Sequence, residues 1–156
     1  MAAPRWLNEA EFRAWIGYRR MRLLLDTEVA RDLVRTSGLS APDYDVLSAL
    51  SEAVDQRQRL TVLAARMLWS KSRLSRHISR MEMRGLVVRV EDAGDSRRAD
   101  VVLTPKGERA IIEAAPGHVE SVRQHLIDLL TEEQLQTLGD IAETVLAHIH
   151  GRTQSE

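Results

Sequence analysis

Two short helical segments lie next to each other in the middle of the chain, and the second runs directly into a β-prone segment. Residues 60–68 and 70–84 carry apolar side chains at helical spacing, and only a turn near Trp69 separates them. Gly85 ends the second segment, and the β-branched run over residues 86–91 predicts a strand. The close succession of these elements is the strongest constraint that the sequence places on the fold.

The predicted strand is expected to pair with a second one. Residues 100–103 contain two adjacent β-branched residues, Val101 and Val102, and the loop 92–98 between the two strands contains turn residues together with Arg97 and Arg98. This arrangement predicts a β-hairpin with a basic tip. Two short helices joined by a tight turn and followed by such a hairpin are the element order of a winged helix-turn-helix.

Helices are expected on both sides of this motif, so the predicted fold class is mainly α with a small β-hairpin wing. Capping boxes at Ser40–Asp43 and Thr131–Gln134 and the Thr104-Pro105 pair mark helix starts, and Pro116-Gly117 should kink or interrupt a helix. The predicted helices outside the motif run from about 8 to 35, from 43 to 53 and from 131 to 150, and a further long helix starts at 105; residues 54–59 form a connector.

Composition excludes several classes of protein. The chain has 156 residues, no Cys and 4% aromatic residues, which fits one domain with an aliphatic core and removes disulfides and thiolate chemistry. It lacks G-x-S-x-G, Walker-type G-K-[ST] and H-E-x-x-H motifs, so we expect no enzyme. No apolar run reaches the roughly 18 residues that a membrane span requires, and no signal peptide is evident, so we expect a cytoplasmic protein.

Positive charge is concentrated in one part of the chain. Residues 57–98 contain 11 Lys or Arg and 4 Asp or Glu, whereas the remaining residues contain 11 basic and 19 acidic ones. A basic block of this kind favours a polyanionic partner, and a solvated charged face is the alternative interpretation.

The segment 70–84 has one apolar face and one face suited to DNA. Leu74, Ile78 and Met81 follow helical spacing and should pack inward. The opposite arc carries Ser and Arg side chains and no acid: Ser72, Arg76, Ser79 and Arg80, with Arg73 and Ser75 at its edges. Guanidinium groups can pair with guanine in the major groove, and hydroxyl groups can bond bases or phosphates.

Each of these side chains also has a purely structural interpretation. The arginines could simply solubilise a surface helix, and for Arg84, beside Glu82, we favour pairing with a nearby carboxylate. No acid lies three or four residues from Arg73 or Arg76, which favours DNA contact for both. His77 lies at the border of the two faces, where packing and DNA contact are equally open.

The complete set of predicted DNA-binding residues includes the helix start and the tip of the hairpin. Ser70 should cap the helix and leave its N-terminal N–H groups available to a phosphate. Arg97 and Arg98 could reach the adjacent minor groove, although Asp95 could instead bind one of them. The predicted DNA-binding residues are Ser70, Lys71, Ser72, Arg73, Ser75, Arg76, Arg80, Arg97 and Arg98.

Several motifs together resemble the MarR family of transcriptional regulators. They are Asp43-Tyr-Asp-Val-Leu47, Leu60-Thr61, Ser70-Lys-Ser72, Arg80, Glu82, Arg84-Gly-Leu86, Asp95-Ser-Arg-Arg98, Val102-Leu-Thr104 and Gly107. The resemblance covers nearly the whole chain, and its most specific part is the wing aspartate with two basic residues and the following Leu-Thr-x-x-Gly. Trp69 departs from the pattern, since such proteins more often have a smaller residue in that turn.

The resemblance implies a triangular homodimer that binds a double-stranded pseudopalindromic operator. Residues 1–38 and 105–156 would form a helical dimerisation region, and residues 40–104 the winged helix-turn-helix, in one intertwined domain. Apolar faces of the terminal helices support a partner, with packing inside a monomer as the alternative. These faces contain Leu23, Leu25, Val29, Leu33, Leu126, Leu129, Leu130, Leu135, Leu138, Ile141, Val145 and Ile149.

The resemblance also implies a repressor that is released from DNA by a small molecule such as an aromatic acid. Candidate ligand-binding residues are Trp15, Tyr18, Arg19, Arg22 and His118, because arginine can hold a carboxylate and an aromatic ring can cover another ring. The alternative is that Trp15 is a core residue and the arginines are solvated.

Cofactors and metals are not expected. His148 and His150 are two residues apart on a predicted helix, where their side chains diverge by about 200°. A winged-helix protein–protein adaptor and a metal-responsive regulator remain the alternative functions.

Overall fold

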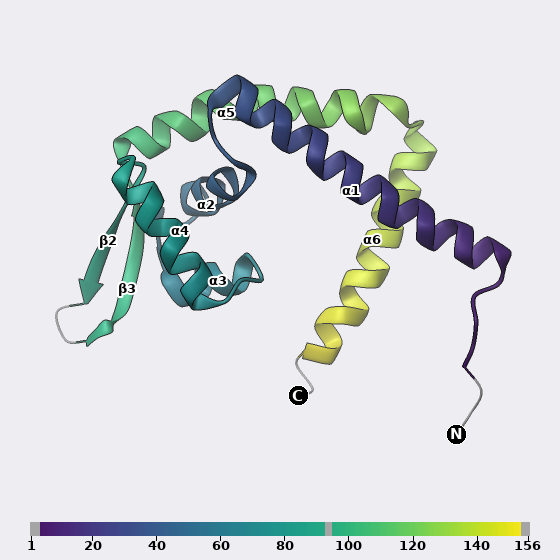
Figure 1. Cartoon of the computed structure of the whole chain (residues 1–156), viewed down its shortest axis with the longest axis horizontal. Helices are drawn as coiled ribbons and strands as arrows, with labels where there is room; N and C mark the ends of the chain where they lie inside the picture. The colour runs from purple at the N-terminus through teal and green to yellow at the C-terminus, as the bar shows by residue number, and fades with distance from the viewer. Residues whose placement is uncertain (1–3, 93–94, 154–156) are drawn as a thin grey trace. The chain divides into compact units, whose positions relative to one another are not determined.

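Helices dominate the described part of the chain (Figure 1). Three strands lie among the described residues of its middle. The computed structural model describes residues 4–92 and 95–153, and the side chains of all of these except 91–98 and 152–153. The elements are α1 (Glu9–Ser37), α2 (Ala41–Ser51), β1 (Arg57–Arg59), α3 (Leu60–Arg66), α4 (Lys71–Met83), β2 (Val87–Asp92), β3 (Asp95–Leu103), α5 (Pro105–His125) and α6 (Glu132–Thr153). Short 3₁₀ turns lie at Val54–Gln56 and Ile127–Leu129.

The helix starts follow local capping chemistry. The Ser40 hydroxyl accepts from the Asp43 N–H, and the Asp43 carboxylate accepts from the Ser40 N–H, which confirms the predicted capping box. The helix begins at Ala41, directly after this cap and two residues earlier than expected. Thr131 and Gln134 exchange the same pair of hydrogen bonds at the start of α6.

Helix α5 continues through Pro116, so the predicted interruption does not occur. A proline removes one backbone donor, here the one that would bond the carbonyl of Ile112. Pro116 and Ile112 are both exposed, so water can hydrogen-bond that carbonyl and the loss is small.

The sheet is larger than the sequence predicted. Residues 57–59, expected to be part of a connector, form the edge strand β1 beside β3, and the strand order is β1-β3-β2 with all pairs antiparallel. Strand β3 begins at Asp95, within the segment that was expected to be a loop, and an irregularity in pairing lies between Glu91 and Asp92. The Arg57 Nε donates to the Asp100 carboxylate at 2.7 Å, which ties β1 to β3.

A close backbone approach joins the sheet to α5 and explains the Leu-Thr-x-x-Gly motif. The Thr104 hydroxyl accepts from the Gly107 N–H at 3.0 Å and lies within hydrogen-bond distance of the Gly85 and Leu86 carbonyls. A Cβ on Gly107 would lie 2.0 Å from the Leu86 carbonyl oxygen. Only glycine therefore allows α5 to start at this point.

The chain divides into two compact units, and residues 26–119 form the larger one. Its core is aliphatic and contains the three residues predicted to face inward from α4. Fully buried side chains are Leu33, Val46, Leu47, Leu50, Leu63, Leu74, Ile78, Met81, Val87 and Val101. The burial of Leu33 here corrects its expected place on a dimerisation face.

The other unit comprises residues 1–25 and 120–156. Its described helices present large apolar side chains to solvent, among them Phe12, Ile16, Leu24, Ile141, Val145 and Leu146. A pocket of about 520 Å³ in this unit is lined by residues that include Met21, Leu126, Leu130 and Leu138. None of the described helices is long and apolar enough to cross a membrane.

Helices α3 and α4 both end in a Schellman motif, but a different residue occupies the left-handed position in each. The Leu86 N–H donates to the Met81 carbonyl, with Gly85 in the left-handed region at φ 72°. The Trp69 N–H donates in the same way to the Ala64 carbonyl, but Leu68 takes the left-handed position at φ 54°. Both are Schellman motifs, in which glycine avoids a clash between Cβ and the backbone.

We predict that Leu68→Gly stabilises the protein. The Leu68 side chain is 92% exposed, so little packing is lost, and relief of the left-handed backbone outweighs the extra entropy of glycine in the unfolded chain by about 0.5–1 kcal/mol. Urea unfolding measures the change, with Leu68→Ala as the control that keeps the unfavourable φ. A loss of stability in the glycine variant would contradict the prediction.

Candidate nucleic-acid interface

The helix-turn-helix consists of α3, the turn at residues 67–70, and α4. The Ser70 hydroxyl accepts from the Arg73 N–H at 3.3 Å, which confirms Ser70 as the N-cap of α4. Leu74, Ile78 and Met81 are buried, so the opposite arc of the helix faces outward. The predicted DNA-binding residues Ser70, Lys71, Ser72, Arg73, Arg76 and Arg80 are all exposed.

Lys71 and Arg76 have no hydrogen-bond or ion-pair partner among the described residues. The Ser72 hydroxyl lies 3.4 Å from that of Ser70, beside the start of the helix. Cations and hydroxyl groups therefore gather at the N-terminal half of α4, and the cations there have no ion pair with a carboxylate among the described side chains. This surface can accept phosphate oxygens or the acceptor atoms of guanine.

Trp69 and Arg73 stack on each other. The Arg73 guanidinium lies 3.8 Å from the centre of a Trp69 ring, and His77 meets Trp69 edge-on at 5.6 Å between ring centroids. The stacking orients the Arg73 side chain while its N–H donors keep access to solvent. Trp69, the residue that departs from the family pattern, thus has a partner that a smaller residue would not provide.

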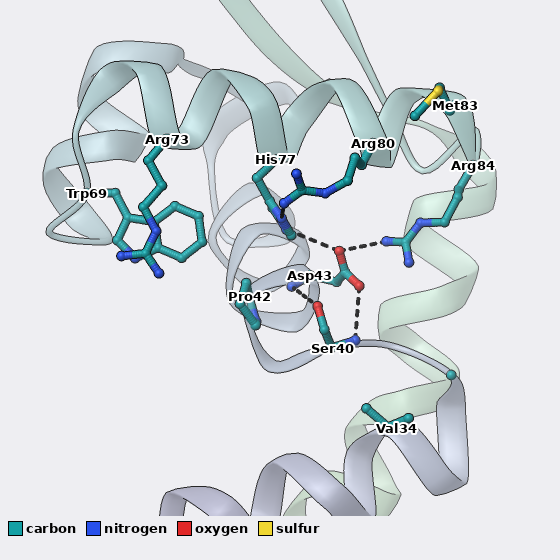
Figure 2. Close-up of a pocket in the computed structure, with 11 residues that line it drawn as sticks. Val34, Ser40, Pro42, Asp43, Trp69, Arg73, His77, Arg80, Met83 and Arg84 are labelled. Atoms are coloured by element: carbon teal, nitrogen blue, oxygen red, sulfur yellow. Dashed lines mark hydrogen bonds and ion pairs between the residues drawn. The ribbon is translucent and has the colours of Figure 1, made fainter.

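Asp43 lies beneath the second half of α4 and connects it to α2 (Figure 2). Its carboxylate is 2% exposed, with Oδ1 at 2.6 Å from Arg84 Nη2 and 3.1 Å from His77 Nε2. Oδ2 accepts from the Ser40 N–H at 2.9 Å. Arg84 therefore pairs with a carboxylate, as the sequence favoured, but with Asp43 rather than Glu82.

Arg80 belongs to the same network. Its Nη2 lies 3.1 Å from His77 Nδ1, and because guanidinium can only donate, Nδ1 accepts and Nε2 carries the proton that faces Asp43. His77 is 6% exposed, which places it in the packed interior rather than on a DNA-facing surface. The Arg80 side chain is directed to His77 in this structure, although it remains accessible.

The pKa of Asp43 lies well below its ordinary value. Burial by itself would raise it, but hydrogen bonds from His77, Arg84 and Ser40 favour the charged form and outweigh that effect. The carboxylate is therefore an anion at neutral pH, and it partly neutralises the arginines around it.

These residues line a pocket of about 680 Å³ on the α4 side of the larger unit. Figure 2 shows Arg73 over Trp69 at one end and Arg84 with Asp43 at the other, with Arg80 between them. Three guanidinium groups and one carboxylate give the pocket a net positive charge, so it can accept an anion.

Ser75 has a partner inside the protein. Arg89 of β2 donates to the Ser75 carbonyl and lies 3.3 Å from the Ser75 hydroxyl, so this predicted DNA-binding residue is engaged by the wing. Arg97 and Arg98 fall in β3, and their side chains lie outside the described residues.

The predicted ligand-binding residues divide between the two units. Trp15 and Tyr18 stack at 6.1 Å between ring centroids, Arg19 lies 5.8 Å from the Trp15 ring, and all three are exposed on α1. Trp15 is therefore not a core residue of the chain. Arg22 is exposed on the same helix. His118, in the larger unit, packs against the Tyr44 ring at 4.3 Å.

Metal-binding groups are absent from the described part of the chain: no three His, Asp or Glu side chains lie close enough together to hold an ion.

Sequence reasoning missed Asp43, His77 and Arg89 as residues that organise the site. Asp43 was identified as the partner of Ser40 in a capping box and as part of a family motif, but not as a partner of α4. Arg89 could have been found, because alternation along β2 places it on the same face as the buried Val87.

We predict that Asp43→Asn destabilises the protein by about 1–3 kcal/mol at neutral pH. The substitution removes the negative charge that faces Arg84 and replaces one of two acceptor oxygens, both of which are in use, by an NH2 donor. A depressed pKa stabilises the folded protein above the unfolded value of 3.8, and this contribution is lost as the pH falls below it. The difference in the free energy of unfolding between wild type and variant should therefore shrink below that pH. Urea unfolding over a pH series measures it, with Asp140→Asn as an exposed control.

Comparison with known proteins agrees with this architecture. The family model described as MarR family matches residues 37–98. The transcriptional regulator HosA of Escherichia coli is 32% identical over 130 residues, which cover 83% of this chain and 94% of HosA.

The MarR family transcriptional regulator AbsC of Streptomyces coelicolor superposes with a TM-score of 0.87 at 38% identity, covering 95% of this chain and 99% of AbsC. Sco3205 of the same organism, a MarR family regulator solved in complex with DNA, gives 0.86 at 37% identity, covering 92% and 90%. The chain therefore belongs to the MarR family and is a transcriptional regulator of that type.

Proposed function

We propose that this protein is a sequence-specific repressor that binds double-stranded DNA as a homodimer and is released from its operator by a small aromatic acid. The observation that carries the DNA-binding part is the exposed, acid-free surface at the start of α4. Lys71 and Arg76 are exposed there, and no carboxylate among the described side chains pairs with either. Sco3205, which resembles this chain over most of its length, was solved with DNA.

Base contacts and phosphate contacts are proposed to come from different residues. Arg76, on the outer arc of α4, is the candidate for base recognition in the major groove. Ser70, Lys71, Ser72 and Arg73 surround the helix N-terminus, where phosphate is the favoured partner. The remaining candidates are Ser75, Arg80, Arg97 and Arg98.

The dimer is proposed to form through residues 1–38 and 105–156, leaving residues 40–104 to contact DNA. Exposed apolar side chains on α1 and α6, such as Phe12, Ile16, Val145 and Leu146, support this division. Two copies related by a twofold axis would present two α4 helices to a pseudopalindromic operator.

The effector is proposed to be an aromatic carboxylate because of the side chains on the first half of α1. Trp15 and Tyr18 offer stacked rings, and Arg19 and Arg22 offer guanidinium groups on the same helix. His118 remains a candidate from the larger unit.

We predict that Arg76→Ala weakens binding to a specific duplex by about 1–3 kcal/mol and relaxes base preference at one position. The specific duplex is selected from a randomised pool with the wild-type protein. Its sequence is then compared with the DNA that flanks the gene of this protein. Fluorescence anisotropy over a salt series gives the affinity and its salt dependence. Arg109→Ala, which removes an exposed arginine of α5, is the matched control.

Two other outcomes would contradict this expectation. An equal loss on all sequences, with a salt slope reduced by about 1, would make Arg76 a phosphate contact and refute base recognition. If the wild-type protein binds no duplex at low salt, the DNA-binding proposal fails and a protein–protein adaptor becomes the better explanation.

We predict that Arg19→Ala combined with Arg22→Ala leaves DNA affinity unchanged but raises the ligand concentration needed for release by about tenfold or more. The measurement is DNA release from the selected duplex in the presence of benzoate-type acids, with Arg13→Ala as a control on the same helix. Unchanged release would remove these arginines from the effector site.

A further inference from the structure

Arg89 is a charged residue on the inward face of the wing. Along β2 the exposed side chains are Val88 and Val90, whereas Val87 is buried and Arg89 is only 26% exposed in its side chain. Period-two alternation therefore directs Arg89 toward α4 rather than toward solvent. A half-buried arginine needs partners, and α4 provides them.

One edge of the Arg89 guanidinium holds the middle of α4. Nη2 donates to the Ser75 carbonyl and lies 3.1 Å from the Ser79 hydroxyl. The Ser79 hydroxyl in turn donates to the Ser75 carbonyl at 3.1 Å. Arg89 thus binds one turn of the helix through both its backbone and its side chains.

A second contact holds the end of the same helix. The Arg89 backbone N–H donates to Glu82 Oε1 at 2.8 Å, and Arg89 Nη1 lies 3.4 Å from Glu82 Oε2. Glu82 lies two turns after Ser75, so a single residue of the wing contacts α4 at two heights, that is, at two positions along the helix axis. Each contact lies off the helix axis and so opposes rotation of α4 about that axis, and the two heights together also restrict its tilt.

We infer that Arg89 is a positioning residue for DNA recognition, acting through Ser75 and Ser79 to set the rotation of α4 relative to the wing. This inference rests on the proposed function, in which Arg76 contacts a base. Arg76 follows Ser75 directly, so rotation of α4 at Ser75 moves Arg76 across the groove. The planar, forked guanidinium suits this role because its donors are fixed relative to one another, unlike the single ammonium group of lysine.

The experiment compares Arg89→Met and Arg89→Lys with the wild type on two duplexes of equal length, one selected by the wild-type protein and one unrelated. Arg31→Met, which removes an exposed arginine paired with Glu28 on α1, is the matched control. Anisotropy over a salt series gives affinity for each duplex and the salt slope. Circular dichroism confirms that each variant is folded at the temperature used.

We expect Arg89→Met to lower affinity for the selected duplex about tenfold or more, with little change on the unrelated duplex and an unchanged salt slope. Arg89→Lys should restore the charge but not the discrimination between duplexes. If both duplexes lose affinity equally and the slope falls by about 1, Arg89 is a phosphate contact and the inference is wrong. Full rescue of discrimination by lysine would also overturn it.

A measurement without DNA tests the same inference independently of the proposed function. Hydrogen exchange of the α4 amides should be faster in Arg89→Lys than in the wild type, while exchange in α2 stays the same. Equal exchange in α4 would refute the contact at two heights. If the wild-type protein shows no preference between duplexes, the proposed function fails on that result alone, and exchange still decides whether Arg89 holds the helix.

Discussion

The buried carboxylate of Asp43 is the interaction on which the arrangement of the larger unit depends. It accepts from the Ser40 N–H at the start of α2 and lies against Arg84 and His77 of α4. A buried charge is costly unless its lone pairs are satisfied, and here donors from two helices satisfy them. The two helices can therefore meet in only one orientation without leaving the anion uncompensated.

Helix α4 is held on two sides by different chemistry. Asp43 and His77 fix the side that faces α2, and Arg89 with Glu82 fixes the side that faces the wing. The buried Leu74, Ile78 and Met81 supply the apolar contact between these polar contacts. What remains is a narrow outward arc at the N-terminal half of the helix. A helix held in this way can present side chains to a rigid duplex without paying ordering entropy at the moment of contact.

The sequence predicted those features that depend on nearby residues. Capping at Ser40 and Thr131, the N-cap at Ser70 and the inward face of α4 follow from spacing within one or two turns, and the structure confirms each. Strand β1 was missed because three residues, two of them arginines, have no alternation to detect and pair only because β3 is beside them. The extension of β3 to Asp95 was missed for a related reason, since turn-forming residues took the place of a β-branched pattern.

In the candidate site, too, the sequence predicted what depends on nearby residues and missed contacts between elements. Helical periodicity places Ser75, Arg76 and Arg80 on the outward side of α4 but contains no information on partners from other elements. Ser75 meets Arg89 of the wing, and Arg80 meets a histidine that is itself bound to Asp43 of α2. Arg76 has no such partner among the described residues. Because arginine and serine bind protein acceptors by the same hydrogen bonds that they offer to DNA, only the tertiary structure can separate the two uses. It leaves Arg76 and Lys71 without a hydrogen-bond, ion-pair or ring partner among the described residues, whereas Arg73 stacks on Trp69.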